Sequence, residues 1–299
     1  MSTSACTLCP RACKALRLAG AAGVCGQTDV VKLARAALHF WEEPPISGQQ
    51  GSGTVFFSGC PLQCVYCQNQ PISTGVVGRE VPIERLAEIF LEQQQRGAHN
   101  INLVTPTHFT EQIKEALVLA RAQGLNLPIA YNCGGYELPE TIMSLAGFVD
   151  IFLTDFKYAS PELAKRYSNA ADYPQIASEA LDAMYALVGA PVYDETGIMK
   201  RGIIVRHLLL PGCLDDSKAV IKLLSEKPYM QDIVLSVMNQ YTPMEGVADS
   251  YPELAKLVSE DDYDELIDYT FECGFEDAFC QEGGAASESF IPAFDYEGV

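Results

Sequence analysis

Short apolar runs alternate with amphipathic stretches over most of the chain. The apolar runs have the length of buried strands. They lie at Thr54–Ser58, Ile101–Thr105, Pro128–Asn132, Asp150–Asp155, Ile203–Leu210 and Asp232–Val237. Between most of them, apolar residues recur with the period of a helix, over Pro82–Arg96, Thr110–Gln123, Leu138–Leu145, a stretch within Pro161–Leu187, and Asp215–Glu226. This alternation predicts an α/β fold in which helices connect the strands of a parallel sheet.

The number of units narrows the architecture. Six strand–helix units are fewer than the eight of a closed barrel. We therefore expect an open, partial (β/α)6 barrel, with a doubly wound sheet as the alternative. The barrel is expected to span residues 51–242, between an N-terminal segment of residues 1–50 and a C-terminal extension of residues 243–299.

The C-terminal region carries most of the negative charge of the chain. The net charge is -19, and residues 230–299 hold 17 acidic residues against one basic residue. We expect the strand–helix alternation to end before this extension. The extension is predicted to form two acidic helices and a tail with apolar side chains for docking, at Tyr251–Val258, Tyr263–Cys273 and Gly283–Val299, the last with Phe290, Ile291 and Phe294.

The composition excludes several classes of protein. A chain of 299 residues with 48% hydrophobic residues has enough apolar surface to fold. Its acidic balance argues against a nucleic-acid partner, and no apolar run approaches the ~20 residues of a membrane helix. The N-terminus leads straight into cysteines without the apolar core of an export signal. We therefore expect a cytoplasmic protein whose eleven cysteines are not paired as disulfides.

The strongest chemical signal is a run of three cysteines after the first predicted strand. Cys60, Cys64 and Cys67 follow Thr54–Ser58 through Gly59. Parallel α/β folds place their chemistry at the carboxyl ends of strands. Metal centres on thiolates normally take four ligands, so three cysteines leave one position open for catalysis. The alternative is a structural site completed by a distant residue such as Cys133.

A second group of cysteines lies near the N-terminus. Cys6, Cys9, Cys13 and Cys25 offer four thiolates within twenty residues, enough to close a tetrahedral site. Four thiolates suit zinc and iron–sulfur clusters alike, and we favour an iron–sulfur centre. The remaining cysteines lack the spacing of ligands and are expected to be buried thiols. They are Cys133, Cys213, Cys273 and Cys280.

Polar residues at the ends of other strands extend the candidate site. Asp155 and Lys157 are alternate residues and share one face, as an ion pair or as ligands of a substrate. Arg206 and His207 interrupt an apolar strand and point to opposite faces, so only one of them can face the barrel interior. His108, after the second strand, is either a hydrogen-bond donor near the substrate or a structural histidine.

The run Cys60-Pro61-Leu62-Gln63-Cys64-Val65-Tyr66-Cys67 resembles the signature of the radical S-adenosylmethionine (SAM) enzymes, in which an aromatic residue precedes the last cysteine. Most of the chain also resembles a branch of the pyruvate formate-lyase activating enzymes. The resembling stretches are Cys6–Gly26, Gly51–Ser73, Asn100–His108, Tyr131–Tyr136, Asp150–Tyr158, Gly202–Pro211 and Asn239–Pro243. The resemblance implies a partial barrel and a 4Fe-4S cluster on Cys60, Cys64 and Cys67. It also implies that the fourth iron takes the amino and carboxylate groups of SAM, which one electron cleaves to methionine and a 5′-deoxyadenosyl radical.

The resemblance also implies residues that bind SAM. Tyr66 would lie beside the adenine, Lys157 would bind the SAM carboxylate, and Asp155 would lie near a cation or the amino group. Thr105, Asn132 and His207 complete the cofactor-binding residues that we expect.

The chain departs from the family pattern at two strand ends. The second strand ends in Asn102–His108 without the Gly-Gly-Glu with which many members bind the amino group of SAM. Hydroxyls, carbonyls or another residue must replace that carboxylate. The third strand ends in Asn132-Cys133, where activating enzymes have Asp-Thr, so a carboxylate that would hold a monovalent cation is missing.

The resemblance implies an enzyme that installs a glycyl radical on a partner protein, with flavodoxin or ferredoxin as the electron donor. The alternatives are a radical enzyme for a small molecule or another peptide and, in a different class, a non-catalytic iron–sulfur electron carrier. A conventional methyltransferase is excluded, because three cysteines stand where it needs a glycine-rich loop.

Overall fold

The computed structural model describes residues 5–244, 246–276, 278–280 and 292–299. Its centre is a set of six parallel strands that coincide with the six predicted runs. They are β2 (Ser52–Phe57), β4 (Ile101–Val104), β5 (Ile129–Cys133), β6 (Ile151–Asp155), β8 (Met199–Leu208) and β9 (Ile233–Met238).

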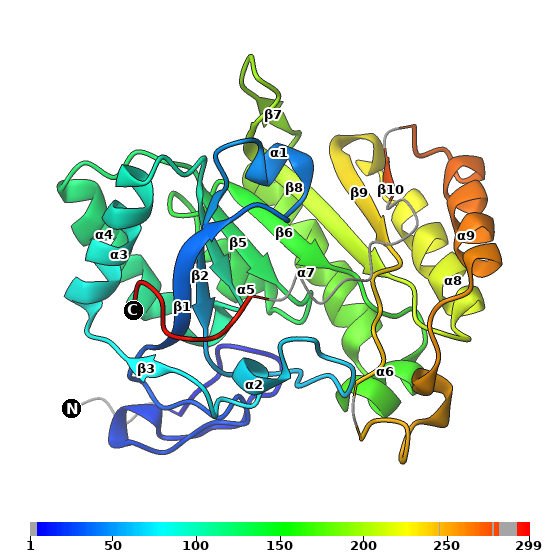
Figure 1. The fold of residues 1–299 in the computed structure, drawn as a ribbon, viewed down its shortest axis with the longest axis horizontal. Coiled ribbons are helices and arrows are strands. Elements are labelled where there is room, and N and C mark those ends of the chain that lie inside the picture. The colour runs from blue at the N-terminus through cyan, green and yellow to red at the C-terminus, as the bar shows by residue number, and fades with distance from the viewer. Residues whose placement is uncertain (1–4, 245, 277, 281–291) are drawn as a thin grey trace.

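The strands pair in the order in which they occur along the chain. A doubly wound sheet reverses its strand order at a switch point, and this sheet does not. Among the described residues the path of pairing runs from β10 (Ala278–Cys280) to β3 (Arg79–Glu80) without closing. The sheet is therefore an open, partial barrel, as predicted (Figure 1).

Helices connect the parallel strands and cover the outer face of the sheet (Figure 1). They are α3 (Ile83–Gln95), α4 (Thr110–Ala122), α5 (Pro139–Met143), α6 (Pro161–Ser168), α7 (Tyr173–Val188) and α8 (Leu214–Ser225). The predicted stretch Pro161–Leu187 divides into two helices at Asn169, whose φ of 48° is left-handed and ends α6. Short turns complete the barrel at η2 (Thr107–Phe109) and η3 (Met230–Asp232).

The inner face of the barrel has its own small core. Side chains from β5, β6 and β8 meet Ile46, a fully buried residue of the short helix α1 (Pro44–Ser47). The members from the sheet are Ala130, Ile151, Leu153, Met199 and Ile204. This apolar layer closes the barrel beneath the polar residues that follow along the same strands.

The N-terminal 50 residues contribute a strand to the barrel sheet. β1 (Lys32–His39) pairs antiparallel with β2, and β3 pairs with β1. The sequence analysis missed β1 because its alanines and basic residues lack the β-branched or aromatic pattern of a strand. Pairing with the buried β2 overrides this weak local preference. The segment also holds η1 (Arg17–Ala19), and β7 (Val192–Tyr193) forms an antiparallel pair with the start of β8.

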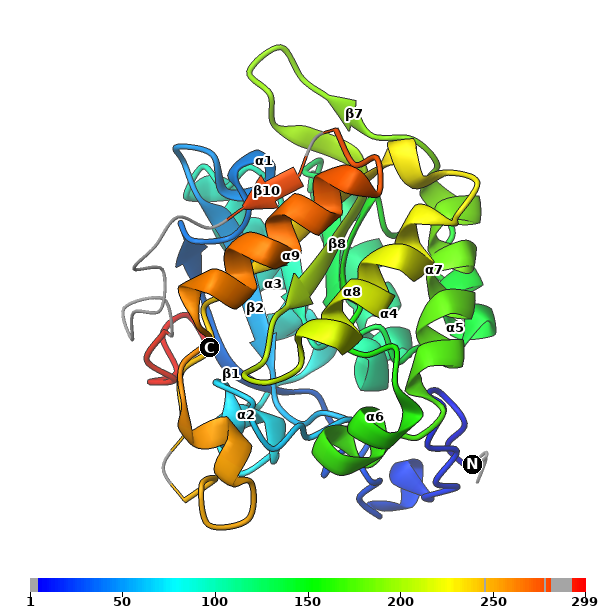
Figure 2. The ribbon, with the colours of Figure 1, turned by 90° about the vertical axis from the view of Figure 1, so that its right-hand side faces the viewer.

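The C-terminal extension continues the alternation by one unit, contrary to the prediction. α9 (Glu260–Glu272) lies beside α8 on the outer side of the sheet (Figure 2), and β10 pairs parallel with β9. The three residues of β10 are too few to give a strand pattern. The helix predicted over Tyr251–Val258 is wrong, because only the turn η4 (Pro252–Ala255) forms before Lys256 becomes extended.

The described part of the tail docks on the barrel, as predicted for Phe294. Its ring centroid lies 5.6 Å from that of Phe56. The N–H of Tyr296 donates to the carbonyl of Ala34 at 3.1 Å, so backbone pairing protects the edge of β1. Phe290 and Ile291 lie outside the described residues. Of the helices the structure describes, none is long and apolar enough to cross a membrane.

Candidate active site

The loop after β2 enters the site through a glycine that no other residue can replace. Gly59 has a φ of 88°, and a Cβ there would lie 2.4 Å from the carbonyl oxygen of Cys25. Only glycine tolerates this left-handed conformation at such close approach. The loop then turns into the barrel at Cys60, and the N–H of Val65 donates to the carbonyl of Tyr167 at 2.9 Å.

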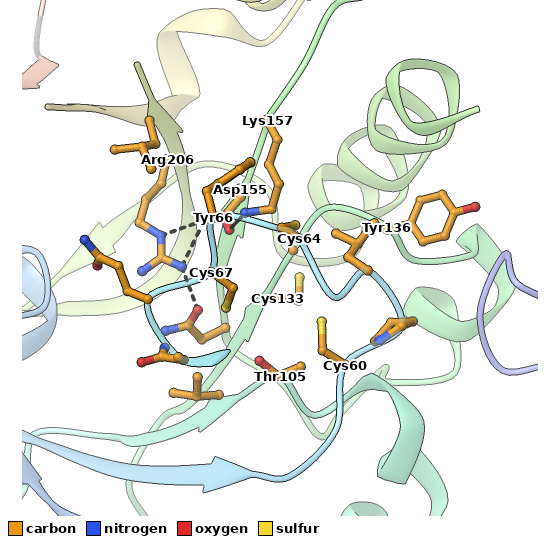
Figure 3. Close-up of a pocket in the computed structure, with 18 of the residues that line it drawn as sticks. Cys60, Cys64, Tyr66, Cys67, Thr105, Cys133, Tyr136, Asp155, Lys157 and Arg206 are labelled. Atoms are coloured by element: carbon orange, nitrogen blue, oxygen red, sulfur yellow. Dashed lines mark hydrogen bonds and ion pairs between the residues drawn. The ribbon is translucent and has the colours of Figure 1, made fainter. Parts of the chain in front are cut away.

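Cys60, Cys64 and Cys67 line one pocket at the carboxyl edge of the sheet, with their sulfur atoms toward the same space (Figure 3). In the described part of the chain, no three cysteine, histidine or carboxylate side chains lie close enough to hold one metal ion. Three thiolates that face one space are the donors that a cluster with one open iron needs. The residues present therefore fit a 4Fe-4S cluster.

Cys133 lines the same pocket and is 3% exposed. Its Sγ donates to Thr154 Oγ1 at 3.6 Å. The sequence analysis expected a buried thiol here and named Cys133 as the fourth ligand of a structural alternative. The thiol is buried. Because it lines the pocket, Cys133 as the fourth ligand of a structural site is still to be tested.

Burial favours the neutral form of two thiols of the pocket. Burial raises the pKa of Cys60 to about 12 and that of Cys67 to about 11, and the neighbouring Cys64 adds to both shifts. Because metal ligands are thiolates, loading a cluster must displace these protons. Ser168 Oγ donates a hydrogen bond of 2.9 Å to Cys64 Sγ.

The N-terminal cysteine segment lies against this loop, and both run along the lower edge of the molecule in Figure 1, near α2 (Gln70–Ser73). Arg11 donates to the carbonyl of Pro61 at 2.8 Å and to that of Ser168 at 2.7 Å. The side chain of Gln63 donates to the carbonyl of Val24 at 3.0 Å. The two cysteine groups are therefore joined through their loops.

Cys6, Cys9, Cys13 and Cys25 lie near one another. Burial raises the pKa of Cys9 to about 11, and the charges of the other three cysteines add to the shift. Gly23 makes room for them, since a Cβ there would lie 3.3 Å from Cys13 Sγ and 3.5 Å from Cys25 Sγ. The structure thus brings together the four residues that the spacing predicted as ligands.

Asp155 is held between two cations at the end of β6. Lys157 Nζ lies 2.5 Å from Oδ2, and Arg206 Nε donates to Oδ1 at 3.0 Å (Figure 3). Burial would raise the pKa of Asp155, but the two cations hold it below its usual value. Both carboxylate oxygens are therefore paired, and Asp155 and Lys157 share a face as predicted.

Arg206, and not His207, occupies the barrel interior. Its guanidinium donates to Asn132 Oδ1 at 2.7 Å and lies 3.4 Å from Glu42 Oε2. His207 points to the outer face of β8, is 1% exposed, and has Nδ1 2.7 Å from the carbonyl oxygen of Phe156. His207 is not among the residues that line the pocket. The expectation that it contacts a cofactor is corrected by this orientation.

The segment after β4 bends into the pocket. Thr105 adopts a φ of 57°, and its N–H donates to the carbonyl of Asn132 at 2.8 Å. A non-glycine residue in this region is strained, and such strain gathers at functional sites. Thr105, Thr107 and Asn132 all line the pocket. Thr107 Oγ1 donates to Glu137 Oε1 at 3.0 Å.

His108 contacts the backbone at the end of β2 and lies outside the pocket. Its Nε2 lies 2.7 Å from the carbonyl oxygen of Ser58, and its ring packs on Phe109 with centroids 4.4 Å apart. Burial lowers its pKa to about 3, so the imidazole is neutral. It donates to the Ser58 carbonyl, which follows β2, and lies outside the pocket lining.

Tyr66 lines the pocket and also belongs to an aromatic core. Its hydroxyl lies 2.7 Å from that of Tyr158, and Tyr158 in turn lies 2.7 Å from Ser168 Oγ. The rings of Tyr158 and Tyr167 pack edge-on against it, with centroids 6.4 and 6.2 Å away. The side chain is thus fixed by the core.

A second cavity of about 370 Å³ adjoins the pocket. Asn132, Arg206 and Gln240 line both, so the two spaces share a wall of polar groups. Its other walls include Glu42 and Glu43, from the segment after β1. Burial raises the pKa of both carboxyls, while Arg206 opposes the shift.

The sequence analysis missed four residues of this site. Glu42 and Glu43 follow β1, which was not predicted, so nothing indicated that they face the interior. Ser168 follows no strand and meets Cys64 only in the fold. Glu137 had a signal, since it comes two residues after Gly134-Gly135, which follow a predicted strand.

Comparison with known proteins agrees with this geometry. A model of the family described as the radical SAM superfamily matches residues 54–201. That span contains the three pocket cysteines and Lys157, and it excludes the N-terminal cysteines. An uncharacterized protein of Methanocaldococcus jannaschii is 27% identical over 228 residues, which is 73% of this chain and 61% of that protein. The chain thus spans about three fifths of the length of this curated relative.

Proposed function

Because the chain belongs to the radical SAM superfamily, we propose that it binds SAM beside a 4Fe-4S cluster on Cys60, Cys64 and Cys67 and removes a hydrogen atom from a substrate. The observation that carries this proposal is one pocket that the three cysteines share with Lys157. Thiolates for the cluster and a cation for the carboxylate of SAM thus face the same space.

The reduced cluster, when bound, supplies one electron to the sulfonium of SAM, which gives methionine and a 5′-deoxyadenosyl radical. The residues of the chain bind and orient the substrates. Lys157 can turn from Asp155 to the SAM carboxylate, because Arg206 still pairs with Asp155. Leu62 and Leu208 add apolar walls to the pocket, and exclusion of water protects a radical from side reactions.

The test is the stoichiometry of SAM cleavage. Anaerobically reconstituted protein with dithionite and SAM should release 5′-deoxyadenosine and methionine in equal amounts, without S-adenosylhomocysteine. The Cys60/Cys64/Cys67→Ala variant is the control and should release neither. A fully loaded, reduced protein that forms no 5′-deoxyadenosine would instead be the non-catalytic electron carrier.

We further propose that the substrate is a glycine of a partner protein, a glycyl radical enzyme. The resemblance of most of the chain to a branch of the activating enzymes supports this choice. Adding the partner should produce an electron paramagnetic resonance (EPR) doublet, because the glycyl carbon radical is split by its remaining α-hydrogen. If the acidic Asp249–Glu297 region docks the partner, activation should fall with salt, since charges are screened beyond ~8–10 Å.

The adjoining cavity favours a second candidate, a small molecule or another peptide. Its lining combines polar side chains such as Glu42 and Glu43 with aromatic ones such as Trp41, and Arg206 lines both this cavity and the pocket of the three cysteines. SAM cleavage without a radical on any glycyl radical enzyme of the host would select this candidate. It would leave the cluster and SAM chemistry unchanged.

We also propose that Cys6, Cys9, Cys13 and Cys25 hold an iron–sulfur centre and not zinc. Four neighbouring thiolates suit either centre, and the content of acid-labile sulfide distinguishes the two. A flavodoxin or ferredoxin is the proposed electron donor. Because these donors are acidic, we expect them to approach away from α9.

A further inference from the structure

Glu137 is a buried carboxylate for which no function has been proposed so far. It lies in the loop after β5, lines the pocket of the three cysteines and is 2% exposed. Its Oε1 accepts the hydrogen bond from Thr107 at 3.0 Å. Its Oε2 is buried and has no hydrogen-bond partner among the described residues.

This arrangement has an energetic consequence. A buried acceptor without a donor costs about 1–3 kcal/mol, and more when it is charged. Burial raises the pKa of Glu137 to about 7, while the hydrogen bond from Thr107, the neighbouring thiol of Cys133 and the charge of Lys157 oppose the shift. A ligand that brings an N–H donor to Oε2 would relieve the cost.

The other carboxylate of the pocket, Asp155, has no unpaired oxygen until Lys157 turns away from it. Both oxygens of Asp155 are paired with Lys157 and Arg206. The amino-acid end of SAM carries a carboxylate and an amino group. Lys157 offers a cation for the first, and the N–H groups of the second need an acceptor.

We infer that Glu137 Oε2 accepts a hydrogen bond from the amino group of SAM, and that Thr107 orients the carboxylate for this contact. The inference rests on the proposed function, because it requires SAM in this pocket. It identifies the acceptor that replaces the carboxylate missing after the second strand. Glu137 comes from the loop after the third strand of the barrel core, and Thr107 from the loop after the second.

Two ligands that differ only at the amino-acid end test the contact. S-adenosylhomocysteine carries the amino and carboxylate groups, 5′-methylthioadenosine carries neither, and neither is cleaved. Their dissociation constants are measured by equilibrium dialysis on the anaerobic, cluster-loaded protein. Glu137→Gln keeps the shape of the side chain and an acceptor for Thr107, but loses the charge and places an amide at the contact.

Glu137→Gln should weaken the binding of S-adenosylhomocysteine about tenfold to a hundredfold, which is the effect expected for one charge-assisted hydrogen bond. Binding of 5′-methylthioadenosine should change less than about twofold. Thr107→Val should lose less affinity for S-adenosylhomocysteine than Glu137→Gln does, and should bind 5′-methylthioadenosine almost normally. The matched control is Glu140→Gln on the exposed face of α5, which should bind both ligands as the unaltered protein does.

The outcomes separate the inference from the proposed function. If Glu137→Gln binds S-adenosylhomocysteine normally, or loses both ligands equally, Glu137 does not hold the amino group, while the proposed function stands. If the unaltered, cluster-loaded protein binds neither ligand, the proposed function fails and the inference fails with it.

Discussion

The hydroxyl of Ser168 donates a 2.9 Å hydrogen bond to the sulfur of Cys64. Hydrogen bonds to cluster thiolates stabilise the more negative, reduced state and raise the reduction potential. Ser168 is in turn fixed by the hydroxyl of Tyr158 at 2.7 Å and through its carbonyl by Arg11 at 2.7 Å. The donor is therefore held in place by the barrel on one side and by the N-terminal segment on the other.

Ser168→Ala should keep the cluster but lower its potential. One lost hydrogen bond of about 1 kcal/mol corresponds to roughly 40 mV for one electron. Ser168→Thr retains the hydroxyl and is the control, with an unchanged potential expected. An EPR-monitored redox titration measures both. Equal potentials for the alanine variant and the unaltered protein would mean that this hydrogen bond does not reach a cluster ligand.

Cys133→Ser should retain the 4Fe-4S cluster and its response to SAM. In the unaltered protein, the EPR signal of the reduced cluster should shift when SAM is added, because one iron is open. A serine at this buried position keeps the hydrogen bond to Thr154, so the fold should persist. The structural alternative, with Cys133 as the fourth ligand, would be favoured by loss of the cluster in this variant. It would also be favoured if SAM left the EPR signal of the unaltered protein unchanged.

The N-terminal cysteines should bind their metal independently of the pocket. The Cys60/Cys64/Cys67→Ala variant should retain iron and acid-labile sulfide on Cys6, Cys9, Cys13 and Cys25, as measured by metal and sulfide analysis. Removing these four cysteines as well should abolish the remaining iron. Retention of one zinc per chain would correct the identity of the centre, and a folded variant without metal would contradict the site.

Lys157→Ala should weaken SAM binding and leave the cluster intact. A charge-assisted hydrogen bond in a dry site contributes about 1.5–3 kcal/mol, or one to two decades in affinity. Asp155 remains paired with Arg206 in this variant, so the pocket should not collapse. Dialysis against SAM is the measurement, and Lys165→Ala on the exposed face of α6 is the control. If Lys157→Ala binds SAM with unaltered affinity, another residue binds the carboxylate of SAM.

His207 should make the folded state sensitive to acid. Burial lowers its pKa to about 4, below the ordinary value of 6.5. Between these values the unfolded chain binds more protons, so the stability that is present above pH 6.5 is lost as the pH falls toward 4. The loss should be about 1.4 kcal/mol per pH unit. Anaerobic urea unfolding at pH 7.5 and 5.5 measures it, and His207→Gln should reduce the difference between the two.

The sequence predicts those parts of the fold whose signal is local. The six parallel strands are buried apolar runs that can be identified without knowing which strand they pair with. The pocket cysteines lie in one short segment, Cys60–Cys67. β1 could not be predicted, because pairing with β2 and not its own residues makes it a strand. The choice between Arg206 and His207 also depends on a neighbour: the register that sets Arg206 opposite Asp155 puts the guanidinium inside.

The contact between Cys25 and Gly59 couples the conformations of the two cysteine segments. The pocket loop turns where the carbonyl of Cys25 packs, and Arg11 ties the next residues to the end of α6. A displacement of Cys25 would therefore move the surface against which the pocket loop turns.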